Sequence, residues 1–245
     1  MDRKRKSSTY LILIVCLFLS TFVKAQSDSS KWQDHGSINL SGTYIDVNNN
    51  TQLLFVGTGS NVLTKNHFQL STIGSLTQLT KNNVEISNDW VIKVQPRLIY
   101  NDWSAFNYEQ FSKIYSRKID FRSEFGIGGG TYFIKTLPVQ GTISYGLIYF
   151  DTKYIDHSRV NGIRQSPRLQ VFGNVKKFNY MFELYYQPLL TDISNYNYNY
   201  TVRLSDPVTS RVAISIALLK TFEYYNFGGT QNSNLNWIVG LTYKY

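Results

Sequence analysis

Asn236-Trp237-Ile238-Val239-Gly240-Leu241-Thr242-Tyr243-Lys244-Tyr245, the last ten residues of the chain, alternate as a β-strand does. One face carries Trp237, Val239, Leu241, Tyr243 and Tyr245, and the other carries Asn236, Thr242 and Lys244, with Ile238 and Gly240 between them. Such period-two alternation gives a strand one apolar face. A strand at the chain end needs a partner for its open edge, and in a barrel it pairs with the first strand. We therefore expect a closed β-barrel.

Eleven earlier segments have the same strand character and are separated by polar or Gly-containing connections. They are 36–45, 51–62, 67–79, 88–100, 104–115, 119–133, 139–149, 167–175, 180–190, a segment around 196–200, and 211–225. The register of 51–62 stays open, because Leu53-Leu54-Phe55-Val56 is apolar on both faces. Twelve is an even number, as bacterial barrels require. The sequence predicts an all-β, transmembrane, antiparallel up-and-down barrel of about twelve strands, which spans 36–245.

The charged residues of these segments share the parity of the polar face, and Lys220 is the one exception that we identify. They are Lys93, Arg97, Arg122, Glu124, Arg168, Glu183, Arg203, Glu223 and Lys244. A charge that faces lipid near the midplane costs about 2–4 kcal/mol, so this bias is typical of a membrane barrel. A secreted β-sandwich would alternate similarly, but its strands average about five or six residues.

Connection lengths support the same interpretation. The turns at 64–66, 101–102, 135–138, 176–177 and 205–207 are short, and we place them in the periplasm with both termini. The alternate connections, above all 151–166 and 226–234, are expected to be longer outer loops.

The N-terminus has the pattern of a signal peptide. A basic stretch at 2–6 precedes an apolar stretch at 10–23, and the small residue Ala25 places cleavage before Gln26. Residues 26–35 are polar and are expected to form a flexible leader. The only cysteine, Cys16, lies inside the signal peptide, which excludes a disulfide framework or thiolate metal site in the remainder.

Removal of residues 1–25 leaves 20 basic and 15 acidic side chains, a net charge of +5. That balance suits a surface beside outer-membrane lipid and lipopolysaccharide, and no basic cluster indicates nucleic acid. The chain is rich in Tyr (19) and Phe (15), and its charged fraction of 17% is modest. This composition favours strands.

The stretch Ile-Asp-Phe-Arg-Ser-Glu-Phe-Gly-Ile-Gly-Gly-Gly-Thr-Tyr-Phe (119–133) resembles the family of domain of unknown function 481, the salt-induced outer-membrane proteins. Similar features are Tyr-Gly-Leu-Ile-Tyr (145–149), Arg168-Leu169 and Leu-Ser-Asp (204–206). The resemblance covers about 36–245 and implies a bacterial outer-membrane barrel without an assigned activity. Gly240, Tyr243 and Tyr245 also resemble the C-terminal signal that the barrel-assembly machinery of Gram-negative bacteria reads.

Few residues suggest chemistry. His35, His67 and His157 lack the spacing of metal ligands, so we interpret them as solvated and expect no metal or other cofactor. His157 and Ser158 lie together in an expected outer loop, where such a pair could serve a lipid hydrolase. The glycines at 126, 128, 129 and 130 lack the Lys-Ser/Thr of a phosphate-binding loop, and we expect them to relieve crowding or permit a bend.

The best functional candidates are the charges expected in the lumen, namely Arg97, Arg122, Glu124, Arg168, Glu183, Arg203 and Glu223. They could pair and fill the interior, or form a charged ring that selects small solutes. Tyr196, Tyr198 and Tyr200 are expected in an interfacial girdle, with a ligand-stacking ladder as the alternative. The sequence predicts a non-enzymatic outer-membrane barrel for envelope integrity or limited solute passage. A lipid hydrolase and a lipocalin-like binding barrel remain as alternatives, and the sequence leaves the oligomeric state open.

Overall fold

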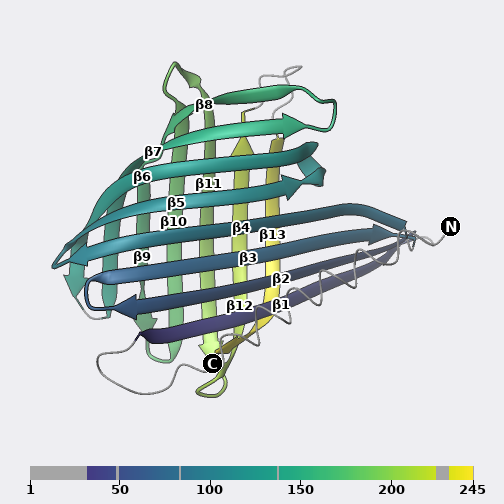
Figure 1. The fold of residues 1–245 in the computed structure, drawn as a ribbon. Coiled ribbons are helices and arrows are strands. Elements are labelled where there is room, and N and C mark those ends of the chain that lie inside the picture. Colours follow the sequence, from purple (N-terminus) through teal and green to yellow (C-terminus); the bar gives the residue numbers. More distant parts are fainter. Residues whose placement is uncertain (1–31, 48–49, 83, 137, 225–231, 245) are drawn as a thin grey trace.

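The computed structural model describes residues 32–47, 50–82, 84–136, 138–224 and 232–244. Its antiparallel strands form a single sheet that closes on itself (Figure 1). The strands are β1 (Gln33–Val47), β2 (Asn50–Lys65), β3 (Phe68–Lys81), β4 (Val84–Tyr100), β5 (Trp103–Ile114), β6 (Ile119–Thr136), β7 (Val139–Tyr154), β8 (Arg159–Gln165), β9 (Arg168–Val175), β10 (Phe178–Leu189), β11 (Asp192–Pro207), β12 (Val212–Glu223) and β13 (Asn232–Lys244). A short 3-10 helix, η1 (Tyr115–Arg117), joins β5 to β6.

The thirteen strands form twelve staves, because β8 and β9 share one position between β7 and β10. β8 pairs with the half of β7 at 147–153, and β9 pairs with the half at 139–144. Between them Ser166 exchanges two backbone hydrogen bonds with Gly146, and Pro167, which has no N–H to donate, interrupts the ladder. The predicted twelve-stranded antiparallel barrel is confirmed.

The barrel closes where β1 pairs with β13. The register runs from Ser37 opposite Lys244 to Ser41 opposite Gly240, and β13 continues along β12 on its other edge. The expected pairing of the first and last strands is therefore confirmed. β1 begins at Gln33, three residues before the predicted start. The predicted signal peptide lies outside the described residues, as does Tyr245 of the predicted closing-strand signal.

The outer surface is apolar and the interior is mixed. Ile127, Trp103 and Trp237 are each 68% exposed and Val239 is 61% exposed, which is expected of side chains that face lipid. The backbone pairing also shows which residues of β2 face the lumen, which the sequence left open. Ser60 pairs with Ser37 on one side and with Ile73 on the other, and Ile73 pairs with Lys93 of the interior.

We name the two rims by the chain ends. The terminal end carries Gln33 and Lys244, and the far end carries the connections from β5 to β6 and from β7 to β8. Two expectations about connections are wrong. The stretch 151–166 is mostly strand, with only a turn at 155–158, and the β11–β12 turn lies at 208–211. Described far-end connections such as 190–191 are also short, so the expected contrast between short inner turns and longer outer loops is absent from the described connections.

The physical reason lies in the far-end rim of β7 and β8. Its outward charges are paired, Asp151 with Arg159 of β8 and Lys153 with Asp120 of the adjacent β6. This hairpin therefore lacks the apolar face that marks the other strands in the sequence. Lys220 is consequently not the only outward charge. Glu109, which pairs in register with outward-facing Val94, shares its parity.

No helix within the described ranges is long and apolar enough to cross a membrane.

Ile127 offers a direct test of which face of the barrel meets lipid. It lies at the middle of β6, so Ile127→Arg is expected to destabilise the barrel by about 2–4 kcal/mol in a bilayer. Urea unfolding in lipid vesicles, followed by tryptophan fluorescence, measures the change. Val208→Arg is the matched control, because Val208 is equally apolar and 59% exposed but lies in a turn. Equal losses for both variants would contradict the lipid-facing assignment.

Candidate functional site: the charged lumen

An ion-pair bridge crosses the lumen near the far end. Glu223 at the end of β12 pairs with Arg122 of β6, and Arg117 of η1 pairs with the same carboxylate at 3.0 Å. β6 and β12 are not neighbours in the ring, so the bridge of Arg117, Arg122 and Glu223 spans the interior. We call these three residues the cross-lumen bridge.

Hydrogen bonds fix the members of the cross-lumen bridge. The Nε of Arg122 donates to the hydroxyl of Thr152 at 2.9 Å, and Arg117 donates to the hydroxyl of Thr221 at 2.8 Å. Arg122 and Glu223 are both buried, 7% and 6% exposed. A buried charge is tolerated when it is paired and hydrogen-bonded, and this arrangement meets that condition. The bridge therefore narrows the far end of the lumen.

A second buried cation lies beside the bridge. Arg164 of β8 donates to the backbone oxygen of Gln187 at 2.9 Å, and to the backbone oxygen and side-chain oxygen of Asn195 at 3.1 and 2.9 Å. Its guanidinium also lies 4.9 Å from the centre of the Phe150 ring. Neutral groups thus satisfy Arg164, which keeps its positive charge without a carboxylate in contact.

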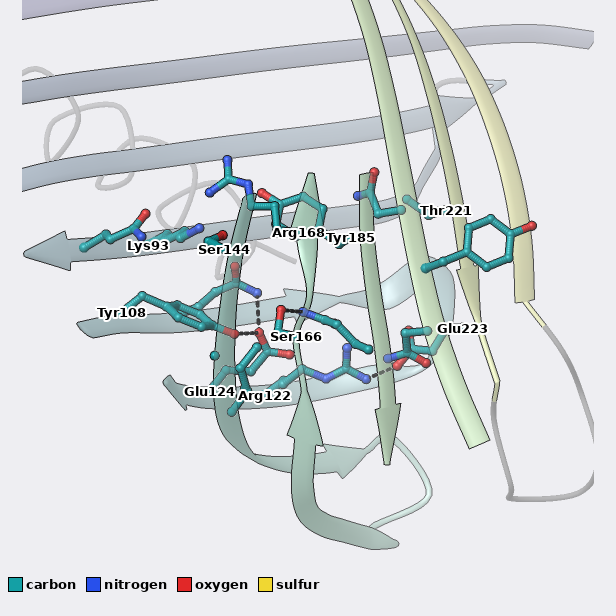
Figure 2. Close-up of a pocket in the computed structure, with 18 of the residues that line it drawn as sticks. Lys93, Tyr108, Arg122, Glu124, Ser144, Ser166, Arg168, Tyr185, Thr221 and Glu223 are labelled. Carbon is teal, nitrogen blue, oxygen red and sulfur yellow. Dashed lines mark hydrogen bonds and ion pairs between the residues drawn. The ribbon is translucent and has the colours of Figure 1, made fainter. Parts of the chain in front are cut away.

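The middle of the lumen holds a second layer of charges (Figure 2). Glu124 of β6 accepts hydrogen bonds from the hydroxyl of Tyr108 at 3.2 Å and from Gln110 at 3.0 Å. Two positions further along the wall, Arg168 of β9 pairs with Glu183 of β10, which also accepts from Gln170 at 3.1 Å. Both carboxylates are therefore held by several donors.

Two cations of this middle layer have no carboxylate partner among the described residues. The Nζ of Lys93 lies 5.0 Å from the centre of the Tyr108 ring, and the guanidinium of Arg97 lies 5.8 Å from that of Phe106. Arg97 and Arg168 also repel each other electrostatically, from β4 and β9. An aromatic face stabilises a cation but does not neutralise it.

A cavity of about 240 Å³ lies between the two layers. Lys93, Tyr108, Glu124, Arg168 and Tyr185 are among the residues that line it (Figure 2). Further along the wall Ile73, which has the inward parity of Lys93, is 41% exposed. An inward side chain that remains exposed to water shows that the lumen is incompletely filled.

Glycines of β6 make room for the aromatic side chains of the lumen. A Cβ on Gly126 would lie 2.5 Å from a ring carbon of Tyr108, and one on Gly128 would lie 2.6 Å from Phe106. The expectation that glycines of this stretch relieve crowding is confirmed at Gly126 and Gly128, because the rings of β5 occupy the space above them.

The structure brings six of the seven predicted lumen charges together, but Arg203 is separate. Arg122 and Glu223 form the bridge, while Glu124, Arg168, Glu183 and Arg97 lie in the middle layer. Arg203 has inward parity but is exposed toward the terminal end, and it does not line the described cavities. In the closing strand, Gly240 is buried at the seam and Tyr243 faces outward at 43% exposure.

Sequence reasoning missed Arg117, Arg164 and the role of Lys93. Arg164 was assigned to a loop because the β7–β8 hairpin lacks an apolar face, and Arg117 belongs to a connection rather than a strand. Lys93 was recognised as inward-facing, yet its alternation gave no sign that it would lack a partner.

The histidines are exposed, as predicted, and the described contacts do not join His157 and Ser158 into the pair that the lipid-hydrolase alternative needs. The Ser158 hydroxyl donates to Asp156 Oδ1 at 2.6 Å, and the Ser158 N–H donates to the same oxygen at 3.0 Å. These bonds hold the pKa of Asp156 in this turn below its usual value. Ser158 is thus engaged in a turn, and no described contact joins it to His157. No group of three or more His, Cys, Asp or Glu side chains in the described ranges could hold a metal ion.

Tyr196, Tyr198 and Phe222 form an aromatic stack on the outer surface. The Tyr198 and Phe222 rings lie 5.1 Å apart with an interplanar angle of 10°, and the Tyr196 and Phe222 rings lie 5.3 Å apart. Tyr200 follows two residues on with the same parity. The rings face outward, as a girdle requires, and the interfacial girdle itself stays a prediction.

Comparison with solved structures places the fold among outer-membrane porins and channels. The NanC porin has a TM-score of 0.52 at 12% identity and matches 84% of this chain and 98% of its own. The COG4313 outer-membrane channel from Pseudomonas putida F1 has a TM-score of 0.55 at 10% identity, with 90% and 98% covered. No protein-family model matches the chain. No curated protein matches it either.

The class is thereby defined by fold: an all-β, antiparallel, twelve-stave closed barrel of the type found in outer-membrane porins and channels.

Proposed function

We propose that this protein is a non-catalytic barrel of the bacterial outer membrane that passes small solutes through a narrow lumen and favours anions. The apolar outer surface supports the location, since exposed outward side chains such as Ile127, Trp237 and Val239 suit a lipid environment. Membership of the family of domain of unknown function 481 remains a prediction from its sequence motifs.

The observation that carries the proposal is the excess of positive charge around the lumen cavities. Five cationic side chains line them, against two carboxylates. The cations are Lys93, Arg117, Arg122, Arg164 and Arg168, and the carboxylates are Glu124 and Glu223. Rings of charged side chains set the ion preference of a pore, and Arg and Lys select anions.

The same geometry makes the passage narrow. Twelve staves fall between small barrels, which side chains fill, and porins of sixteen strands, which hold an aqueous channel. Here the cross-lumen bridge occupies the far end, while the exposed side chain of Ile73 marks space along β3. We therefore propose restricted passage of small solutes rather than general diffusion.

Planar-bilayer recording tests this proposal on protein purified from outer membranes. We expect discrete current steps and, under a KCl gradient, a reversal potential of the sign that indicates chloride preference. A cation-selective reversal potential would contradict the proposed anion preference. Silent bilayers, from protein whose migration on SDS gels still shifts on heating, would mean a closed lumen and would overturn the channel.

A further inference from the structure

We infer that Lys93, Arg97 and Arg168 form a binding site for a small organic oxyanion, a carboxylate or a phosphate ester, in the middle of the lumen. The inference deepens the proposed function and rests on it only for the route by which the ligand arrives. Lys93 and Arg168 line the cavity of about 240 Å³. Arg97 lies two residues beyond Gln95 on the same face of β4, and Gln95 also lines the cavity.

The contrast with the cross-lumen bridge separates a ligand site from a structural cluster. In the bridge one carboxylate accepts from both Arg122 and Arg117, and threonine hydroxyls complete their hydrogen bonds. In the middle layer the Nζ of Lys93 makes no hydrogen bond or ion pair to any described residue, and its one described contact is the Tyr108 ring. Arg168 uses one terminal nitrogen for Glu183, while its buried Nε has no partner.

A buried donor without a protein partner costs free energy, and the Nε of Arg168 is such a donor. Lys93, Arg97 and Arg168 also repel one another, and an additional negative group among them would offset that repulsion. An oxyanion supplies both the missing acceptors and the missing charge. Guanidinium and ammonium groups are the side chains that bind carboxylate and phosphate.

The remaining lining indicates the body of the ligand. Gln95, Gln110, Gln187 and Asn199 provide amides, and Tyr108 and Tyr185 provide aromatic surface. Amides donate to and accept from hydroxyl groups, and they are present on several walls. The site therefore suits a small anion that carries hydroxyl groups beside its charged end.

Binding is measured on the whole protein in detergent by isothermal titration calorimetry, which requires no conductance. The probes are gluconate for a carboxylate, glycerol 3-phosphate for a phosphate ester, and sorbitol as the neutral counterpart of gluconate. We expect at least one of the two anions to bind and sorbitol not to bind. The anion that binds identifies the preferred charged group. Equal binding of sorbitol, or no binding by either anion, would overturn the site.

Variants locate the binding. Lys93→Gln is expected to weaken it about tenfold or more, because a hydrogen bond to a charged group contributes about 1.5–3 kcal/mol. Lys93→Arg should retain most of the affinity, and Arg97→Gln gives a second loss should Lys93→Gln fail to fold. Arg203→Gln, which removes an exposed cation outside the cavity, is the matched control. Equal weakening by Arg203→Gln would show that only the overall charge matters and would overturn the site.

The two proposals fail in different ways. Anion binding by a protein that is silent in bilayers would overturn the channel and leave the oxyanion site standing. Anion-selective conductance without binding of either probe would overturn the site alone.

Discussion

Replacing Glu223 with glutamine is expected to open the far end of the lumen and destabilise the barrel. Glutamine has nearly the same shape but no charge, so Arg122 and Arg117 would lose their common counter-ion. Leaving a buried charge unpaired costs about 3–5 kcal/mol. The freed arginines should also strengthen anion preference. Single-channel conductance and reversal potential measure the first effect, and urea unfolding in vesicles measures the second.

Asp151→Asn is the matched control for Glu223→Gln. Asp151 also pairs with an arginine at the far end, but it faces outward and its partner Arg159 is exposed. Exposed ion pairs contribute about 0–1 kcal/mol, so neither stability nor conductance should change much. The combined change Arg117→Met, Arg122→Met and Glu223→Leu should recover stability, because it leaves no cation of the bridge unpaired and apolar replacement of a buried ion-pair group is often neutral. Glu223→Gln with unchanged stability and current would mean that the bridge does not form in the membrane.

A single methyl group at Gly128 is expected to impair folding of the barrel. The Cβ of alanine would lie 2.5 Å from the Tyr145 carbonyl oxygen, 2.6 Å from a ring carbon of Phe106 and 2.9 Å from the Cα of Gly146. Two of these atoms belong to the backbone of the paired strand and cannot move without disturbing the ladder. Overpacking costs about 1–3 kcal/mol, and backbone contact puts this position at the upper end.

Gly74→Ala is the matched control for Gly128→Ala, because a Cβ at Gly74 meets nothing within 4 Å. Its stability should stay within about 0.5 kcal/mol of the parent. The fraction of heat-shifted protein on SDS gels and the urea midpoint compare the two variants directly. Normal folding of Gly128→Ala would show that β6 and β7 are not packed as described.

The alternation of apolar and polar residues was sufficient to predict the barrel strands, but it did not predict the hairpin of β7 and β8 at the far end. Between Trp90 and Tyr149 most outward positions are apolar, as lipid favours, so alternation marks the strands. At the far end of β7 and β8 the outward positions carry Asp151, Lys153 and Arg159, and the hairpin resembles a loop in sequence. Backbone pairing alone extends these strands.

The candidate site was predictable in composition but not in pairing. Alternation assigned Arg97, Arg122 and Glu223 to the interior, since parity follows from local sequence. Which cation meets which carboxylate depends on closure, which brings β6 against β12 although 101 residues separate Arg122 from Glu223. Arg203 likewise lies outside the described cavities because of its position along the barrel axis, toward the terminal end.

The sequence by itself determined the number of staves, the apolar surface and the inward parity of most charges, because each depends on two-residue periodicity along one strand. Only the tertiary structure decided that Glu223 pairs with two arginines, while Lys93 and Arg97 form no ion pair with a carboxylate of the described residues. Distances across the lumen are set by the stagger of all twelve staves, and no local segment encodes that stagger.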